Sequence, residues 1–251
     1  MGWVSDPKLE AMFSPYGPTL RELAVQALSS VERGYDLLAP KFDHTPFRTP
    51  DVVLDSVAEA LAPMGPFAHG LDLCCGTGAG LDVLRAVCGQ SVTGLDFSAG
   101  MLAVGRDRAR SAGPPRTAWV RGDARALPFG PAFDLVVSFG AFGHFLPREL
   151  PGLFAQVRSV LRPGGRFVFP IGAPPRPDSP LYWALSGFDT VMRVRNAVRR
   201  PQFVMYYRTF RFGDVLRELG RAGFSVEHRA LPALGRRPDG SPRCRLIVAT
   251  G

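Results

Sequence analysis

The residues best suited to hold a small molecule lie in a glycine-rich stretch. Residues 70–80 read GLDLCCGTGAG, an apolar run that leads into glycines and then into a helical pattern. Glycines allow a tight turn and close approach of a ligand, and the N–H groups that begin a helix can bind a polar group. Asp72, inside the apolar run, can face either the loop amides or a ligand ammonium. The stretch predicts a ligand-binding loop.

A second acidic residue suits a nucleoside. Asp96 follows Gly76 by twenty residues and lies near the end of the apolar stretch SVTGLDF (91–97). An acid at the tip of a second strand can accept both hydroxyls of a ribose. A dinucleotide fingerprint needs its third glycine at the position of Leu81, so the loop is a poor pyrophosphate cradle. The alternative is that the glycines only form a turn and Asp96 only caps the next helix.

His144 is the candidate general base. It lies in FGAFGHF (139–145), just beyond a predicted strand. An imidazole with a pKa of about 6.5 can take a proton from a phenol, enol or hydroxyl. The alternative is that His144 only lines the site. No carboxylate occurs between Val136 and Pro147, so the sequence predicts no metal ligands here.

These residues need a sheet to position them. From Gly70 onward short apolar runs alternate with helical patterns, which is typical of a mostly parallel sheet. Strands are predicted at 70–75, 92–97, 118–122, 133–139, 165–171, 225–231 and 243–250. Helices are predicted at 20–33, 51–62, 79–88, 98–110, 148–161 and 213–222, with a loop or short helix at 35–43. The predicted fold class is α/β, a Rossmann-like seven-stranded sheet, mostly parallel, with a C-terminal antiparallel strand.

The pattern also predicts three regions. Residues 1–66 are expected to form an N-terminal helical cap, and 67–172 with 213–251 a Rossmann-like cofactor-binding domain. Residues 173–212 break the rhythm with prolines followed by an aromatic, arginine-rich helix, and are predicted to form a lid between the fifth strand and the last helix. The lid region holds seven arginines and two aspartates, and this local excess accounts for most of the net charge of +8 of the whole chain.

Composition narrows the class of protein. The 251 residues hold 46% hydrophobic and 21% charged residues, as expected for a globular chain with a full core. No apolar run approaches the roughly 20 residues of a membrane span, and residues 1–13 lack the apolar core of a signal peptide. The four cysteines form no CxxC pair, which favours buried, reduced thiols and a cytoplasmic location over a thiol-ligated metal or metalloid.

Several stretches resemble the class I S-adenosylmethionine-dependent methyltransferases, in the small-molecule branch with the methyltransferase-11 and ubiquinone-biosynthesis enzymes. LDLCCGTG (71–78) is similar to the glycine motif of that family, and GLDFS (94–98) with Met101 is similar to its ribose-binding strand end. RGDARALPF (121–129) resembles the adenine loop. FDLVVSF (133–139) and LRPGGRF (161–167) resemble the beginnings of the fourth and fifth strands. The resemblance covers about residues 70–170.

The resemblance implies S-adenosylmethionine as cofactor and a role for each matched residue. Gly76 and Gly78, with Thr77 between them and Asp72 before them, would approach the methionine part, and Asp96 would hold the ribose. Phe97 and Met101 would pack on the adenine. Asp123 would accept a hydrogen bond from the adenine amino group, with the Ala124 N–H nearby. Ser138 and Phe139 would line the cofactor at the tip of strand four. Tyr35 matches a Tyr-Asp motif in the part of the ubiquinone-type enzymes that covers the cofactor.

The acceptor is expected to be small and largely apolar, methylated at O, C or N. The lid is rich in apolar and aromatic side chains, which suit aromatic, polyketide, quinone or lipid-like molecules. Those side chains are Leu181, Tyr182, Trp183, Leu185, Phe188, Val191, Met192, Val194, Phe203, Met205, Tyr206, Tyr207 and Phe210. The lid arginines either face solvent or pair with an acidic acceptor group.

Three other functions stay open. An arginine-rich amphipathic helix at 181–200 allows peripheral contact with a membrane surface and a lipid or quinone acceptor. The basic excess allows an RNA or protein methyltransferase, but no RNA-binding module or ordered basic stripe is evident, so no nucleic-acid partner is expected. A non-catalytic cofactor-binding protein is the third. The sequence does not indicate an oligomeric state.

Overall fold

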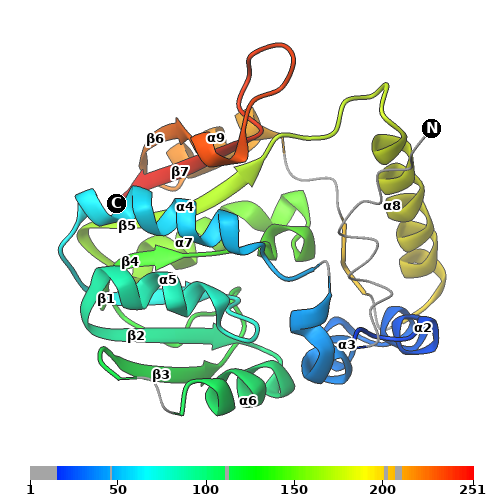
Figure 1. Cartoon of the computed structure of the whole chain (residues 1–251), viewed down its shortest axis with the longest axis horizontal. Coiled ribbons are helices and arrows are strands. Elements are labelled where there is room, and N and C mark those ends of the chain that lie inside the picture. The colour runs from blue at the N-terminus through cyan, green and yellow to red at the C-terminus, as the bar shows by residue number, and fades with distance from the viewer. Residues whose placement is uncertain (1–15, 46, 111–112, 201–202, 207–210) are drawn as a thin grey trace.

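A single seven-stranded sheet forms the centre of the molecule (Figure 1). The computed structural model describes residues 16–45, 47–110, 113–200, 203–206 and 211–251. The strands are β1 (Phe67–Leu73), β2 (Cys88–Asp96), β3 (Arg116–Arg121), β4 (Phe133–Val137), β5 (Leu161–Gly172), β6 (Ser225–Ala230) and β7 (Cys244–Thr250). Their order is β3-β2-β1-β4-β5-β7-β6, and β7 runs antiparallel to β5 and β6 while the other neighbouring strands are parallel. The predicted Rossmann-like fold class is confirmed.

Helices cover both faces of this sheet. They are α4 (Asp51–Leu61), α5 (Ala79–Val87), α6 (Ala99–Arg108), α7 (Leu150–Val160) and α9 (Phe212–Arg221). In β4, the side chain of Val136 packs in the core with α7 and α9, whereas Leu135 and Val137 pack in the core with α4 and α5. This alternation along a strand that is covered on both faces explains why Leu135, Val136 and Val137 are all apolar.

The strand order reverses between β1 and β4. The chain proceeds outward from β1 to β2 and β3, then returns to pair β4 with the other edge of β1. The crossovers from β1 and β4 therefore leave in opposite directions, which opens a crevice at the carboxyl ends of these strands. The glycine loop after β1, the acid at the end of β2 and the segment after β4 meet there.

The N-terminal region contains two helices where the sequence predicted one at 20–33. α2 (Leu20–Leu28) ends at Ser29, and α3 (Val31–Leu38) begins after Ser30, whose hydroxyl accepts a hydrogen bond from the Arg33 N–H at 3.2 Å. Serine caps a helix start well because its side chain replaces a missing backbone partner, so the Ser-Ser pair breaks the helix. The predicted loop or short helix at 35–43 is the end of α3 followed by a 3₁₀ helix, η1 (Ala39–His44).

The lid region contains one long helix, α8 (Pro180–Val198). Ser179 caps it by accepting from the Tyr182 N–H at 3.2 Å, and Pro180 occupies the first turn. Figure 1 shows α8 apart from the sheet, on the side where α2 and α3 lie. The predicted lid residues Tyr207, Arg208 and Phe210 lie outside the described residues, as do residues 1–15 of the cap. In the described part of the chain, no helix has the length and apolar character needed to span a bilayer.

The first strand ends earlier than predicted. β1 stops at Leu73 rather than residue 75, because Cys74 adopts a left-handed conformation with φ 59°. Cys74 and Cys75 therefore lie in the loop and do not alternate across a strand. Neither forms a disulfide. Burial raises the pKa of both thiols well above the ordinary value, so both are neutral and unreactive at physiological pH.

Candidate active site

The glycine loop is held in place by the acid at the end of β2. Gly76 and Gly78 have positive φ values of 53° and 94°, a conformation that suits glycine. The Gly76 N–H donates to Asp96 Oδ2 at 2.9 Å, and the Ser98 N–H donates to Asp96 Oδ1 at 2.9 Å. One carboxylate thus fixes both the loop and the start of α6. Burial raises the pKa of Asp96, while these backbone donors act against that rise.

Asp72 is an acid buried beside the glycine loop. Its side chain is 1% exposed, and neither carboxylate oxygen has a hydrogen-bond partner among the described residues. It does not accept from the loop amides, which was one of the two predicted alternatives. Burial, and secondarily the charge of Asp96, raises the pKa of Asp72 well above its ordinary value. A buried carboxylate at a cleft is stabilised by a cation, so the site fits a ligand with an ammonium group.

A cleft between the sheet and the N-terminal cap collects nine of the predicted site residues. Its lining includes Tyr35, Asp72, Gly76, Thr77, Asp96, Phe97, Met101, Phe139 and His144, together with Phe42, Phe47 and Thr49 of the cap. The cleft encloses about 100 Å³. Ligand pockets for molecules of cofactor size usually enclose about 300–1,000 Å³, so the cap has to move outward to admit a nucleoside.

Four predicted site residues do not line this cleft. Gly78 packs behind the loop, where a Cβ atom would lie 2.5 Å from the Trp119 ring. Ser138 is buried and its hydroxyl donates to the Leu73 carbonyl at 3.0 Å, which ties β4 to β1. Asp123 accepts from the Arg125 N–H at 2.9 Å with its side chain half exposed, and Ala124 is buried in the core. Their roles toward a cofactor stay predictions.

His144 contacts a residue 109 positions away in the sequence. The Tyr35 hydroxyl lies 2.8 Å from His144 Nε2, and His144 Nδ1 lies 2.9 Å from the Val204 carbonyl. A carbonyl only accepts, so Nδ1 carries the proton and Nε2 accepts from the Tyr35 O–H. Burial lowers the pKa of His144, while the Val204 carbonyl acts in the opposite direction. The imidazole is thus neutral with its basic nitrogen turned toward Tyr35.

Two acids that sequence reasoning missed hold the cap on the cleft. Asp36 accepts from the Ser98 hydroxyl at 2.6 Å and from the Gly100 N–H at 2.9 Å, at the start of α6. Asp43 accepts from the Thr77 hydroxyl at 2.7 Å and pairs with Arg108 at 2.7 Å. The Tyr-Asp motif could have indicated Asp36. Asp43 carries no local signal, because its partners lie 34 and 65 residues farther along the chain.

A larger cavity of about 480 Å³ lies between α8, α9 and the segment after β4. Its walls are mainly apolar and aromatic, and three arginines reach it. The lining residues include Phe142, Gly143, Phe145, Leu150, Tyr182, Leu185, Arg193, Tyr206, Arg211 and Arg217. Gly143 borders this cavity and the adjacent His144 borders the cleft, so the 3₁₀ turn η3 (Ala141–His144) lines both spaces and the cavity adjoins the cleft.

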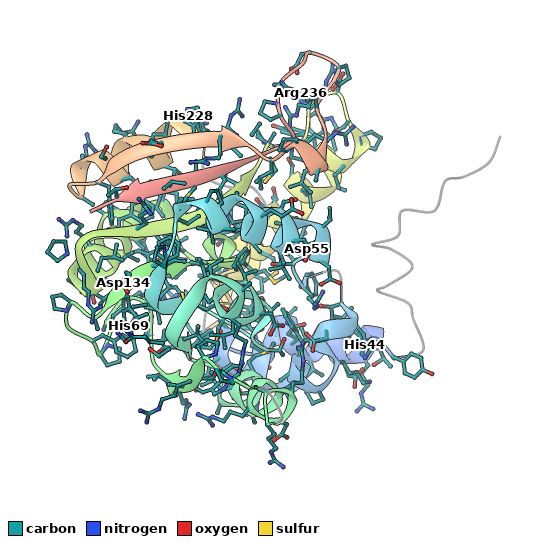
Figure 2. All side chains as sticks on the ribbon, turned by 60° about the vertical axis from the view of Figure 1, so that its left-hand side comes forward. His44, Asp55, His69, Asp134, His228 and Arg236 are labelled. Carbon is teal, nitrogen blue, oxygen red and sulfur yellow. The ribbon has the colours of Figure 1, made fainter. Side chains whose placement is uncertain are left out.

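An acid and a histidine far from the cleft hold strands together. Asp134 Oδ2 accepts from the backbone N–H groups of Ala68 at 3.0 Å and His69 at 2.8 Å, and the His69 ring contacts the Ser91 hydroxyl at 2.8 Å. These bonds tie the amino ends of β1, β2 and β4 together. Figure 2 shows His69 and Asp134 on the other side of the molecule from His44 of the cap.

Comparison with known proteins agrees with this geometry. Residues 71–165 match the family profile of a methyltransferase domain. The chain is 39% identical over 101 residues to a 2-phytyl-1,4-naphtoquinone methyltransferase of Thermosynechococcus vestitus, covering 39% of this chain and 44% of that protein. It is 46% identical over 110 residues to a demethylmenaquinone methyltransferase of Clavibacter sepedonicus, covering 43% and 42%. The chain thus spans less than half the length of these two relatives.

Solved structures share the fold at lower identity. A magnesium protoporphyrin IX methyltransferase of Synechocystis with bound S-adenosylhomocysteine superposes with a TM-score of 0.55 at 20% identity, over 78% of this chain and 80% of that one. A candidate O-methyltransferase of Nostoc punctiforme superposes with a TM-score of 0.66 at 18% identity, over 97% of this chain and 72% of that one. Residues 71–165 match the methyltransferase profile and the solved structures share the fold, so this part of the chain is a class I S-adenosylmethionine-dependent methyltransferase domain.

Proposed function

We propose that this protein transfers a methyl group from S-adenosylmethionine to a small, largely apolar acceptor. The observation that carries the proposal is the buried Asp72 carboxylate, which lines the cleft next to the glycine loop and Asp96 and has no hydrogen-bond partner among the described residues. A ligand with both an ammonium group and a ribose satisfies these two acids. A nicotinamide dinucleotide offers no ammonium group for Asp72 and would need a pyrophosphate cradle that the loop lacks.

Different residues of the cleft would hold different parts of the cofactor. Asp72 would pair with the ammonium of the methionine part, and the Asp96 carboxylate, which keeps lone pairs beyond its two backbone bonds, would accept from the ribose hydroxyls. Phe97 and Met101 offer apolar surface to the adenine. When bound, the cofactor supplies an electrophilic methyl group on a sulfonium. The enzyme then mainly has to align the acceptor and exclude water.

The cavity beneath α8 is the proposed acceptor site. Its aromatic walls suit a flat apolar molecule, and Arg193 and Arg211 at its edge suit an acidic group on that molecule. The names of two relatives refer to 2-phytyl-1,4-naphtoquinone and to demethylmenaquinone, and this favours a quinone-like or other aromatic acceptor here. The atom that receives the methyl group, whether O, C or N, stays open.

Tyr35 and His144 form the proposed proton acceptor. His144 Nε2 accepts from the Tyr35 hydroxyl, so a proton leaving an acceptor O–H can pass to the Tyr35 oxygen while the Tyr35 proton passes to His144. His144 ends as an imidazolium, and the acceptor oxygen keeps the electron pair that forms the new bond to carbon. Because burial lowers the pKa of His144, its imidazole is neutral, and so able to accept a proton, at neutral pH.

The test is a pooled-metabolite assay with isotope-labelled methyl donor. Wild type is expected to label an apolar product, and Asp96→Ala is expected to abolish cofactor binding and labelling. Tyr35→Phe and His144→Ala are expected to lower turnover by about 10²–10⁴-fold for an acceptor that loses a proton, with cofactor affinity changed less. Near-native affinity of Asp96→Ala by calorimetry would contradict the ribose assignment. Cofactor binding without labelling of any metabolite would contradict the proposed reaction.

A further inference from the structure

The outer face of α8 is strongly apolar. Trp183, Val191, Val194 and Val198 are 67%, 65%, 59% and 81% exposed, and their spacing of three, four and eight residues puts them on one side of the helix. The opposite side is already used, since Asp189, Met192 and Asn196 are buried. An exposed stripe of this kind marks a contact surface.

The charges beside this stripe have one sign. Among the described residues of α8 and its C-terminal end, the exposed charged side chains are Arg193, Arg199 and Arg200, whereas the acid Asp189 is buried. Arg195 lies next to the stripe and donates to the Ser29 carbonyl at 3.0 Å. The outer face of α8 therefore combines apolar side chains, a tryptophan and arginines, which is the composition of helices that lie in a membrane interface.

The end of α2 extends the same surface. The Arg195–Ser29 bond brings the C-terminal part of α8 to the end of α2, where Val25 and Leu28 are 46% and 47% exposed. Figure 1 shows α2 beside the end of α8, away from the sheet. Two helices with exposed apolar side chains thus share one side of the molecule, and neither side chain of α2 lines the cleft or the larger cavity.

We propose that the outer face of α8 docks on an anionic membrane surface. The stripe would enter the headgroup region while the arginines attract anionic lipids, each contributing about fivefold in partitioning. A second copy of this chain is a poorer partner, because a symmetric contact through this face would bring like-charged arginines together. Docking goes beyond the proposed reaction and would hold whatever acceptor the enzyme uses.

The test is cosedimentation of the full chain with vesicles, without turnover. Wild type is expected to bind phosphatidylcholine vesicles that contain phosphatidylglycerol, to bind pure phosphatidylcholine at least about tenfold more weakly, and to dissociate at high salt. Val191→Asp with Val198→Asp, and separately Arg199→Glu with Arg200→Glu, are expected to reduce binding about tenfold or more. None of these residues lines the cleft or the larger cavity, so cofactor affinity should stay unchanged and reports that the variants are folded.

Matched controls lie elsewhere on the surface. Val52→Asp changes a valine on α4 that is 48% exposed, and Arg229→Glu changes an exposed arginine on β6. Both are expected to bind vesicles like wild type. The proposal is overturned if wild type does not bind, if it binds neutral and anionic vesicles equally, or if the controls lose as much binding as the α8 variants. It is also overturned if centrifugation detects a dimer that the α8 variants dissociate.

Discussion

At the scale of single residues, Asp72 is the most informative side chain. Burial of a carboxyl group without a partner costs free energy in the ligand-free protein, and the raised pKa reports that cost. Because the folded-state pKa is raised, the contribution of Asp72 to stability is complete below the unfolded pKa and is lost as pH rises through the folded pKa. A bound ammonium ligand lowers the pKa of Asp72 again, because it favours the ionised carboxylate.

Asp72→Asn is therefore expected to weaken cofactor binding about ten- to a hundredfold, because hydrogen bonds to charged groups contribute about 1.5–3 kcal/mol. The ligand-free variant is expected to unfold at the same temperature as wild type or above it at neutral pH. Calorimetry in buffers of different ionisation enthalpy measures proton release on binding, expected for wild type and absent for Asp72→Asn. Equal proton release from both proteins would contradict the pairing with the ammonium.

The sequence predicts some of these residues and not others. Asp72 and Asp96 are recognisable because each lies beside a local pattern, a glycine loop or a strand end. The contact between Tyr35 and His144 joins residues 109 positions apart, and the bond from His144 to Val204 joins it to the lid. Such contacts depend on how the cap and lid pack over the sheet, and no local pattern encodes that packing.

At the scale of elements, side chains pack closely against the junction of β1 and α5. A Cβ atom on Gly80 would lie 2.5 Å from Asp72 Oδ2 and 2.7 Å from the Phe139 ring, and both residues line the cleft. Gly187, inside α8, has no heavy atom within 4 Å of the same position. Close packing therefore requires a glycine at position 80 and does not require one at position 187.

Gly80→Ala is expected to lower cofactor affinity at least about tenfold and to destabilise the fold by about 1–3 kcal/mol, the usual cost of overpacking. Gly187→Ala is expected to stabilise it by about 0.5–1 kcal/mol with unchanged affinity, because alanine favours a helix interior. Chemical denaturation and calorimetry measure both. A harmless Gly80→Ala would mean that the junction is less tightly packed than described.

Asp43 bonds the cap to the sheet side of the cleft. It accepts a hydrogen bond from Thr77 and pairs with Arg108, and the cleft encloses about 100 Å³. Asp43→Ala is expected to speed both association and dissociation of the cofactor severalfold, measured by stopped flow. Asp107→Ala, which removes the exposed ion pair with Arg110 outside the cleft, is the control and should leave both rates unchanged. Rates unchanged in Asp43→Ala would show that cap opening does not limit binding.

Sequence patterns predict which helices and strands occur better than they predict where each one begins and ends. Apolar runs within β1, β2, β4 and β5 are long enough to be recognised, since each of these strands pairs on both sides and is largely buried. The break at Ser29–Ser30 was missed, because apolar side chains recur at helical spacing on both sides of it. The early end of β1 was missed because nothing in the residue type marks the left-handed conformation of Cys74.

At the scale of the whole molecule, ligand binding should stabilise the folded chain. S-adenosylhomocysteine at about 100 times its Kd adds about 2.7 kcal/mol, which raises the Tm of a chain of this size by about 5–10 °C. NAD at the same concentration is expected to leave the Tm unchanged. Thermal unfolding followed by fluorescence measures both, with Asp96→Ala as the variant that should not respond. A shift with NAD and none with S-adenosylhomocysteine would reverse the assignment of the ligand.

The position of β7 between β5 and β6 has a consequence for synthesis on the ribosome. The last strand of the sheet to be made fills the space between two earlier strands, pairing with β5 over 244–250 and with β6 over 245–250. Until those residues emerge, β5 presents an unpaired edge and β6 has no neighbour, so a nascent or truncated chain exposes apolar strands that invite self-association. Stalled or shortened copies of this chain should therefore depend on chaperones far more than the finished protein does.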